Sequence, residues 1–253
     1  MENNQLTFFR SLETNSSAYT NLVEQVNEQS VWPKYLLQDR NNLKYWDKLY
    51  EVFPLYQFFL LEGNRVVGSG NCVPLYLTPK EKESLPDEGW DWAIAKAFAD
   101  FEQELKPNAL CALQISVDPA YQGKGVSKYL IDYMKGIAVE NNFSDFILPI
   151  RPTLKHRYPL QQMDSYMQWI NNRGLPYDAW IRSHVKNGAT IVKVCNKAMV
   201  VEGTVLEWEA WTNLTFQTSG EYILPLALNP MKIDMALNKG IYIEPNVWMR
   251  YAL

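Results

Sequence analysis

The most informative part of the sequence is a glycine-containing turn that joins an apolar run to an amphipathic segment. The turn reads D-P-A-Y-Q-G-K-G over residues 118–125, and Val126 and Ser127 follow it directly. Glycines remove side-chain bulk, so successive N–H groups can point outward where the next helix begins. That end of a helix carries roughly half a positive charge. The turn therefore predicts an anion-binding site.

Two common phosphate-binding motifs do not describe this turn. The dinucleotide fingerprint G-x-G-x-x-G fails because position 128 is Lys, and no acidic residue with a ribose role is evident. The Walker pattern fails because no Gly-Lys-Ser/Thr follows a four-residue gap. A turn that only connects a strand to a helix is the structural alternative.

Few side chains are available for acid–base chemistry near neutral pH. His156 and His184 are the two histidines of the chain. Cys72, Cys111 and Cys195 are widely spaced, lie in apolar strand-like runs and form no C-x-x-C pair. We expect buried free thiols in a reducing cytoplasm, with no disulfide framework and no metal site.

The composition is that of an ordinary globular protein. The chain has 253 residues, of which 47% are hydrophobic and 21% charged, and its formal net charge is −4. A protein that binds nucleic acid over a broad face is usually basic, so that class is disfavoured. The longest apolar stretches fall far short of a membrane span, and the first residues lack the features of a secretory signal. We expect one domain.

The elements around the turn predict a strand–helix–strand unit. Residues 110–117 form an apolar strand, in which 111, 113, 115 and 117 are expected to share one buried face. An amphipathic helix starts at Val126, and residues 146–150 form the next strand, which completes a βαβ unit. Other patterns predict a helix at 15–29 capped by Asn15 or Ser16, one or two helices over 34–53, and helices at 92–105 and 179–186. Thr204 and Glu207 have the spacing of a capping box, which predicts a helix at 204–211. Strands are predicted at 7–9, 56–61, 65–73, 189–194, 222–226, 240–244 and 247–251.

The motif Q-G-x-G-x-S after V-x-P resembles the pyrophosphate loop of the GNAT (GCN5-related N-acetyltransferase) family. The resemblance implies an α/β fold with a twisted, mixed central sheet flanked by helices, in which a splayed strand pair receives acyl-CoA. It covers about residues 7–200, and residues 201–253 would extend the sheet. It implies that the CoA pyrophosphate meets backbone N–H groups of Gln122, Gly123, Lys124, Gly125, Val126 and Ser127. The pantetheine amides would pair with the backbone of Ile115, Ser116 and Val117.

One position departs from the usual family pattern. GNAT proteins usually carry a Tyr four residues before the Gly that opens the next strand, and this Tyr is often the acid that protonates the leaving thiolate. Here that position holds His184, followed by Gly188. An unperturbed imidazole titrates near pH ~6.5, so we expect His184 to act as the catalytic acid or base. A partly buried histidine bonded to a nearby carbonyl is the alternative.

Three further segments, at residues 151–160, 203–209 and 244–249, resemble GNAT-like domains that load starter units in curacin-type polyketide synthases. In that group a Thr and a His promote decarboxylation of a malonyl-type acyl-CoA. By position, Thr153 and His184 match these residues, and Trp46 matches an early Trp. The group's Arg after the His has no clear equivalent, and Lys197 is the nearest basic residue.

Plainer explanations remain open for several of these residues. The Thr153 hydroxyl can bond local backbone, as Thr often does in loops. Trp46 lies on an apolar helical stripe and can serve core packing instead of lining an acyl pocket. The basic cluster Arg151, Lys155, His156 and Arg157 can bind substrate phosphate, meet an acidic carrier protein, or be solvated.

The sequence thus predicts a cytoplasmic acyl-CoA-dependent acyltransferase that passes an acetyl or similar group to an amine or a carrier thiol. Catalysis is assigned to His184 and Thr153, and substrate binding to Trp46 and Arg151. One alternative is a malonyl-CoA-type decarboxylase and S-acyltransferase that loads an acyl carrier protein. A non-catalytic CoA-binding module is the second alternative. The expected partner is a small-molecule acyl-CoA, with neither nucleic acid nor membrane, and the acceptor is not predicted.

Overall fold

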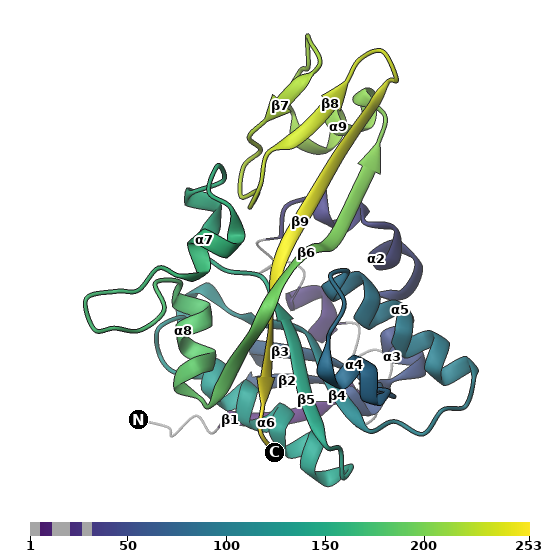
Figure 1. Ribbon diagram of the computed structural model, residues 1–253. Helices are drawn as coiled ribbons and strands as arrows, with labels where there is room; N and C mark the ends of the chain where they lie inside the picture. Colours follow the sequence, from purple (N-terminus) through teal and green to yellow (C-terminus); the bar gives the residue numbers. More distant parts are fainter. Residues whose placement is uncertain (1–5, 12–20, 27–31) are drawn as a thin grey trace.

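The computed structural model describes residues 6–11, 21–26 and 32–253. Its described strands form one mixed sheet in the order β1-β2-β3-β4-β5-β9-β8-β7, and β6 pairs with β9 (Figure 1). The pairing is antiparallel except between β4 and β5. The strands are β1 (Leu6–Arg10), β2 (Gln57–Glu62), β3 (Arg65–Leu75), β4 (Ala109–Val117), β5 (Asp145–Ile150), β6 (Ala189–Gly203), β7 (Gly220–Tyr222), β8 (Met231–Asp234) and β9 (Lys239–Tyr251).

Helices cover both faces of the sheet. One core joins it to α5 and to the segment before β2, and a second core joins the opposite face to α6 and α8. The α-helices are α2 (Arg40–Tyr45), α3 (Leu49–Val52), α4 (Pro79–Glu83), α5 (Gly89–Glu102), α6 (Val126–Glu140), α7 (Met163–Met167), α8 (Ala179–Lys186) and α9 (Val205–Thr212). The 3₁₀ helices are η2 (Leu36–Gln38), η3 (Pro54–Tyr56), η4 (Pro119–Tyr121) and η5 (Lys155–Arg157). The predicted GNAT-type α/β architecture and the βαβ unit β4–α6–β5 are confirmed.

A bulge in β4 changes the face to which its side chains point. Asn71 of β3 pairs with Gln114 and Cys72 pairs with Ala112, so Leu113 is an extra residue. Cys111 and Leu113 face the α5 core, whereas Ile115 and Val117 pack on the α6 core. The expected single face through 111, 113, 115 and 117 is therefore wrong beyond Leu113, because an inserted residue reverses the alternation.

The strands β4 and β5 separate soon after they meet. Their parallel pairing covers only Ala109–Cys111 of β4 and Asp145–Ile147 of β5. Beyond this point the β5-facing edge of β4 has no strand partner among the described residues, while the other edge stays paired with β3 up to Val117. The splayed strand pair that the family resemblance implied is confirmed.

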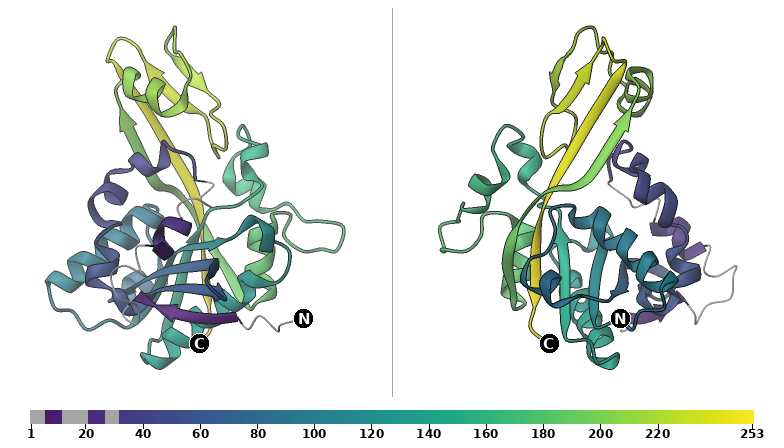
Figure 2. Two further views of the ribbon diagram at one scale, coloured as in Figure 1. Left: turned by 180° about the vertical axis from the view of Figure 1, so that it is seen from behind. Right: turned by 45° about the vertical axis from the view of Figure 1, so that its right-hand side comes forward.

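The strands β6 and β9 continue past the core as a long ribbon that carries α9, β7 and β8 (Figures 1 and 2). β9 is one strand, although the sequence predicted two with a break near Pro245. The pairing skips from Cys195–Asn246 to Met199–Glu244, so a bulge in β6 lies opposite Pro245. A proline cannot donate a ladder hydrogen bond, and the bulge removes the need for one.

One further predicted strand differs from the structure at its ends. The predicted strand 222–226 is realised only as Gly220–Tyr222. The cap of the predicted helix 15–29 lies outside the described residues, and residues 21–26 are helical. The capping box predicted at the start of α9 is confirmed, because Thr204 and Glu207 cap each other's backbone N–H groups. None of the described helices has the length and apolarity needed to cross a membrane.

Candidate active site

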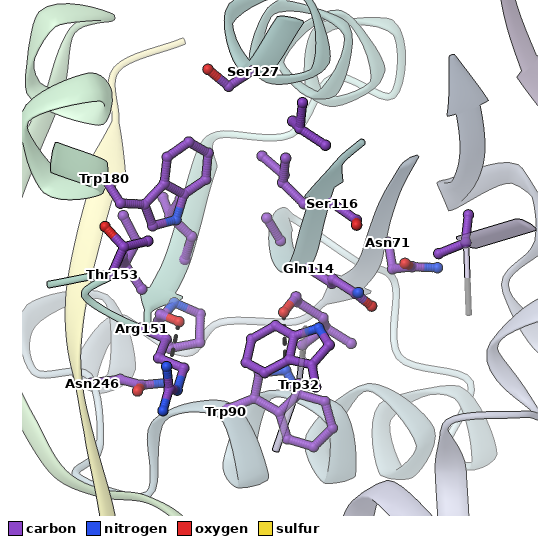
Figure 3. Close-up of a pocket in the computed structure, with 18 of the residues that line it drawn as sticks. Trp32, Asn71, Trp90, Gln114, Ser116, Ser127, Arg151, Thr153, Trp180 and Asn246 are labelled. Carbon is purple, nitrogen blue, oxygen red and sulfur yellow. Dashed lines mark hydrogen bonds between the residues drawn. The ribbon is translucent and has the colours of Figure 1, made fainter. Parts of the chain in front are cut away.

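A cavity of about 1290 Å³ occupies the gap between β4 and β5. One end is lined by the turn at residues 121–127, and we call it the glycine-turn end. The other end is lined by Trp32, Trp46 and Trp90 together with Arg151 and Asn246, and we call it the tryptophan end. Figure 3 shows Ser127 at the top of the cavity, with Arg151 and Asn246 facing Trp32 and Trp90 at the bottom.

The glycine turn is held in a left-handed backbone conformation. Gly123 has φ +76° and Gly125 has φ +83°, values that side-chain-bearing residues rarely adopt. A Cβ atom at either glycine would meet no described protein atom within 4 Å, so packing within the protein does not require glycine here. Asp118 steadies the turn because its Oδ1 accepts from the Ala120 N–H at 2.8 Å and its Oδ2 pairs with Arg65 at 2.6 Å.

The turn presents unused hydrogen-bond donors where α6 begins. Gly125 is the N-cap residue of α6, and no side chain caps the helix. Four N–H groups have no acceptor among the described residues: those of Gly123, Gly125, Val126 and Ser127. Together with the helix dipole, these donors fit a pyrophosphate, and the unpaired edge of β4 fits an extended amide-bearing arm.

His184 lines the cavity from α8 but is fully buried. Its Nδ1 lies 2.7 Å from the Tyr251 hydroxyl, and its Nε2 has no hydrogen-bond partner among the described residues. Burial, with a smaller contribution from Lys135, lowers the pKa of His184 to about 3. The expectation that this imidazole titrates near pH ~6.5 is therefore wrong. The ring is therefore neutral at working pH. It can donate one hydrogen bond and accept another, but it does not gain or lose a proton in that pH range.

Thr153 is brought to the same cavity by Asp178, the N-cap residue of α8. The Asp178 carboxylate accepts from the Leu154 N–H at 2.7 Å and from the Trp180 N–H at 2.9 Å. It therefore ties the segment after β5 to the helix that carries His184. The Thr153 hydroxyl lies 3.5 Å from Asp178 Oδ1, at the limit of a hydrogen bond, so this contact leaves it available to a ligand.

The predicted substrate-binding residues lie at the tryptophan end. Trp46 stacks on Trp90 at a ring-centroid distance of 6.2 Å, and both line the cavity. Arg151 lines it as well and pairs with the fully buried Glu244 at 2.5 Å. Lys155 differs from the expected basic cluster, because it is fully buried and does not line the cavity.

Sequence reasoning missed several cavity residues. Trp32, Trp90, Gln114, Glu244 and Asn246 all line the cavity but come from distant segments of the chain. Glu244 and Asn246 lie in the segment 244–249 that resembled the loading domains, but no residue of it was assigned to the site, and no motif connects it to the other three residues. No group of three or more His, Cys, Asp or Glu suited to a metal ion occurs within the part of the chain that the structure describes.

Comparison with known proteins places this geometry in a family. The family model "Acetyltransferase (GNAT) family" matches residues 20–157. The chain therefore belongs to the GNAT acetyltransferase family and is an acyl-CoA-dependent acyltransferase. Acyl-CoA is the co-substrate, and the glycine-turn end has the donors and the unpaired strand edge that it needs.

A related protein and two solved structures are consistent with membership of this family. The arginine N-acetyltransferase avaD of Aspergillus versicolor is 28% identical over an alignment of 248 positions, gaps included, that covers 87% of this chain and 84% of the relative. The loading GNATL domain of CurA from Lyngbya majuscula has a TM-score of 0.60 at 15% identity, with 98% of each chain covered. The GphF GNAT-like decarboxylase in complex with isobutyryl-CoA has a TM-score of 0.53 at 15% identity, again with 98% of each chain covered. The resemblance to curacin-type loading domains is thus confirmed at the level of fold.

Proposed function

We propose that this acyltransferase passes an acyl group from acyl-CoA to the amine of a small molecule held at the tryptophan end. The observation that carries the proposal is one continuous cavity of about 1290 Å³ that joins the glycine turn to Trp32, Trp46 and Trp90. Its volume accommodates the pantetheine arm together with a small acceptor. The 28%-identical arginine N-acetyltransferase supports an amine or guanidine as the nucleophile.

Transfer is direct, without an acyl-cysteine on the protein. Cys72, Cys111 and Cys195 are buried free thiols that do not line the cavity, and burial raises the pKa of each. In the direct reaction the amine nitrogen bonds to the acyl carbon and the carbon–sulfur bond breaks. One amine proton goes to the leaving thiolate, so the products are an amide and the CoA thiol.

We assign His184 a hydrogen-bonding role in this reaction. Within the described residues, the Tyr251 hydroxyl has one hydrogen-bond partner, Nδ1 of His184. We infer that the phenol donates its proton to Nδ1, and in that tautomer the ring proton lies on Nε2. A neutral Nε2–H can stabilise negative charge on the thioester oxygen, and the Thr153 hydroxyl can assist it.

The test is acetyl transfer with purified protein. Acetyl-CoA is incubated with a panel of small amines that includes arginine, and also with an acyl carrier protein bearing its free thiol. We expect release of the CoA thiol and an amine product heavier by one acetyl group. Transfer to the carrier thiol alone, with no amine modified, would overturn the proposal.

A second candidate, decarboxylation of a malonyl-type acyl-CoA, is favoured by Thr153 and His184 lining one cavity. There the Nε2–H of His184 would hold the carbonyl oxygen of the enolate, and the acyl group would pass to a carrier protein. Carbon dioxide released from malonyl-CoA, without any amine present, would select this candidate. Carbon dioxide that stays at the level of a no-enzyme control would reject it.

We also propose a reducing compartment, the cytoplasm, as the location. All three cysteines are free and buried, and an oxidising compartment favours paired cysteines. Counting thiols in the denatured protein, isolated without oxidant, should give three. A persistent disulfide would contradict this location.

A further inference from the structure

Three charged side chains beneath the tryptophan end, two of them fully buried, leave one positive charge unbalanced. Arg151 and Glu244 form an ion pair, and the Glu244 side chain is fully buried. Lys155 is also fully buried, but its Nζ donates to carbonyl oxygens, those of Tyr158 at 2.9 Å and Leu228 at 2.6 Å. Burial lowers the pKa of Lys155 to about 8, so its ammonium is charged at neutral pH. Buried charges are ordinarily paired, so this cluster lacks one anion.

Arg151 is the cation of this cluster that reaches the cavity. Its Nε donates to Glu244 and its Nη2 donates to the Leu226 carbonyl at 2.6 Å. Neither N–H of Nη1 has an acceptor among the described residues. The guanidinium carbon lies over the Trp32 ring, 5.8 Å from its centroid. A guanidinium with free N–H groups is well suited to a carboxylate.

Asn246 lies beside Arg151 in Figure 3, and within the described residues its Oδ1 lacks a hydrogen-bond donor, whereas Arg151 Nη1 lacks an acceptor. Its side chain is 3% exposed and lines the cavity, and its Oδ1 has no partner among the described residues. Its Nδ2 lies 3.4 Å from the Pro149 carbonyl oxygen, which can only accept, so the amide cannot be flipped without loss. An orphan acceptor in this position needs an N–H or O–H from a ligand.

We propose that this wall is a subsite for an α-amino acid: Arg151 binds the acceptor's carboxylate, and Asn246 Oδ1 accepts a hydrogen bond from its amine. This inference rests on the proposed amine acylation and names the class of acceptor. The carboxylate supplies the missing anion of the Arg151–Glu244–Lys155 cluster. A malonyl-type acyl group also carries a carboxylate, but it has no N–H for Asn246.

The closing experiment compares matched acceptors with the wild-type protein. Each L-amino acid of a panel (arginine, lysine, leucine, phenylalanine) is tested beside its carboxamide, with acetyl-CoA saturating. Because a hydrogen bond to a charged partner is lost in the amide, kcat/KM for the best amino acid should exceed that of its amide by about 10–100-fold. Equal rates for acid and amide would overturn the subsite while leaving amine acylation intact.

Two outcomes distinguish this subsite from its alternatives. One tests the proposed amine acylation itself, and the other tests whether the bound carboxylate belongs to a malonyl group instead of the acceptor. Binding of acetyl-CoA without acetylation of any amine would overturn the proposed function, and this acceptor assignment with it. Malonyl-CoA that binds at least tenfold more tightly than acetyl-CoA, with no acceptor present, would assign the carboxylate to the acyl group and overturn the acceptor assignment.

Variants give an independent readout. In Arg151→Gln/Glu244→Gln both partners of the buried ion pair are neutral, so neither is left as a lone buried charge. The preference for acid over amide should fall to about threefold or less, with the dissociation constant of acetyl-CoA unchanged. Arg157→Gln, on the same segment but exposed, should keep the preference. If the double variant does not fold, the acid–amide comparison in the wild-type protein still decides.

Discussion

The glycine-turn end of the cavity is formed by one short stretch of chain, residues 121–127, whereas the tryptophan end is formed by side chains from separate segments. At the glycine turn the unused hydrogen-bond donors are backbone N–H groups, and the residue types matter through the φ angles they allow. At the tryptophan end the cavity is lined by the side chains of Trp32, Trp90, Arg151 and Asn246. The difference explains why one end is evident from sequence and the other is not.

The comparison also predicts how function divides between the two ends. Damage to the glycine turn should weaken CoA binding and leave acceptor recognition intact. Damage to the tryptophan end should do the reverse. His184 lies in the wall of the same cavity and, as a group that would contact the reacting thioester, should change turnover without changing either affinity.

The largest effect is expected from His184→Ala. Loss of a preorganised donor at the thioester oxygen should lower kcat by about 10²–10³-fold, with the CoA dissociation constant changed less than threefold. Steady-state kinetics and calorimetry measure the two quantities, and a melting curve checks that the fold survives. His156→Ala, in η5 outside the cavity lining, is the control and should retain nearly full activity. A His184→Ala enzyme within threefold of wild type would show that the ring is only structural.

Gly125→Val tests the glycine-turn end. A β-branched residue is strained at φ +83°, so the substitution should distort the turn that presents the unused N–H groups. We expect CoA to bind well over tenfold more weakly in a calorimetric titration. Gly136→Ala is the matched control, since it lies in the same helix, has open space around it and has no positive φ. CoA affinity like that of wild type in Gly125→Val would remove the pyrophosphate from this turn.

Trp32→Leu tests the tryptophan end. The variant keeps an apolar side chain but removes the ring that lies over the Arg151 guanidinium. A cation–π contact of about 1 kcal/mol corresponds to roughly fivefold, so KM for the acceptor should rise by about that factor. CoA affinity should not change. An equal loss of CoA affinity would contradict the assignment of CoA binding and acceptor binding to separate ends of the cavity.

A feature of this structure could be predicted from the sequence when neighbouring residues determine it. The turn, the helix start at Val126 and the capping box of α9 were all predicted, because neighbouring residues decide them. The bulge at Leu113 and the continuity of β9 through Pro245 were not, because each depends on the register of a partner strand. The extra residue at Leu113 sends the side chains after it to the opposite face of the sheet, whereas periodicity alone predicts one continuous face.

The site shows the same limit. His184 was located from its spacing to Gly188, but its protonation was misjudged because burial and the contact with Tyr251, 67 residues away, are tertiary facts. The pairing of Arg151 with Glu244 spans 93 residues, and no spacing rule would find it. A local motif was therefore enough to predict residues that line the cavity, whereas their surroundings became known only from the fold.

The smallest predicted effect depends on pH and concerns the contact between α2 and α5, which lies next to the tryptophan end. Asp39 caps α2, the helix that precedes Trp46, and its carboxylate acts electrostatically on Asp91 of α5. Burial, together with the Asp39 carboxylate, raises the pKa of Asp91 to about 8. Between its unfolded value near ~3.9 and this folded value, the native protein holds a proton that the unfolded chain has lost.

Stability contributed by this pair should therefore fall as pH rises from about 4 to about 8. Asp91→Asn keeps a hydrogen-bonding side chain but removes the titration, so its free energy of unfolding should depend less on pH across that window. Urea unfolding at pH 5, 6.5 and 8 measures the difference between the two proteins, and Asp132→Asn on the exposed face of α6 is the control. If α2 is held in this way, raising the pH to 8 should also increase KM for the acceptor in the wild-type enzyme more than in Asp91→Asn, with CoA affinity the same in both. Parallel pH profiles for the two proteins would show that the Asp39–Asp91 contact holds no proton and does not support the tryptophan end.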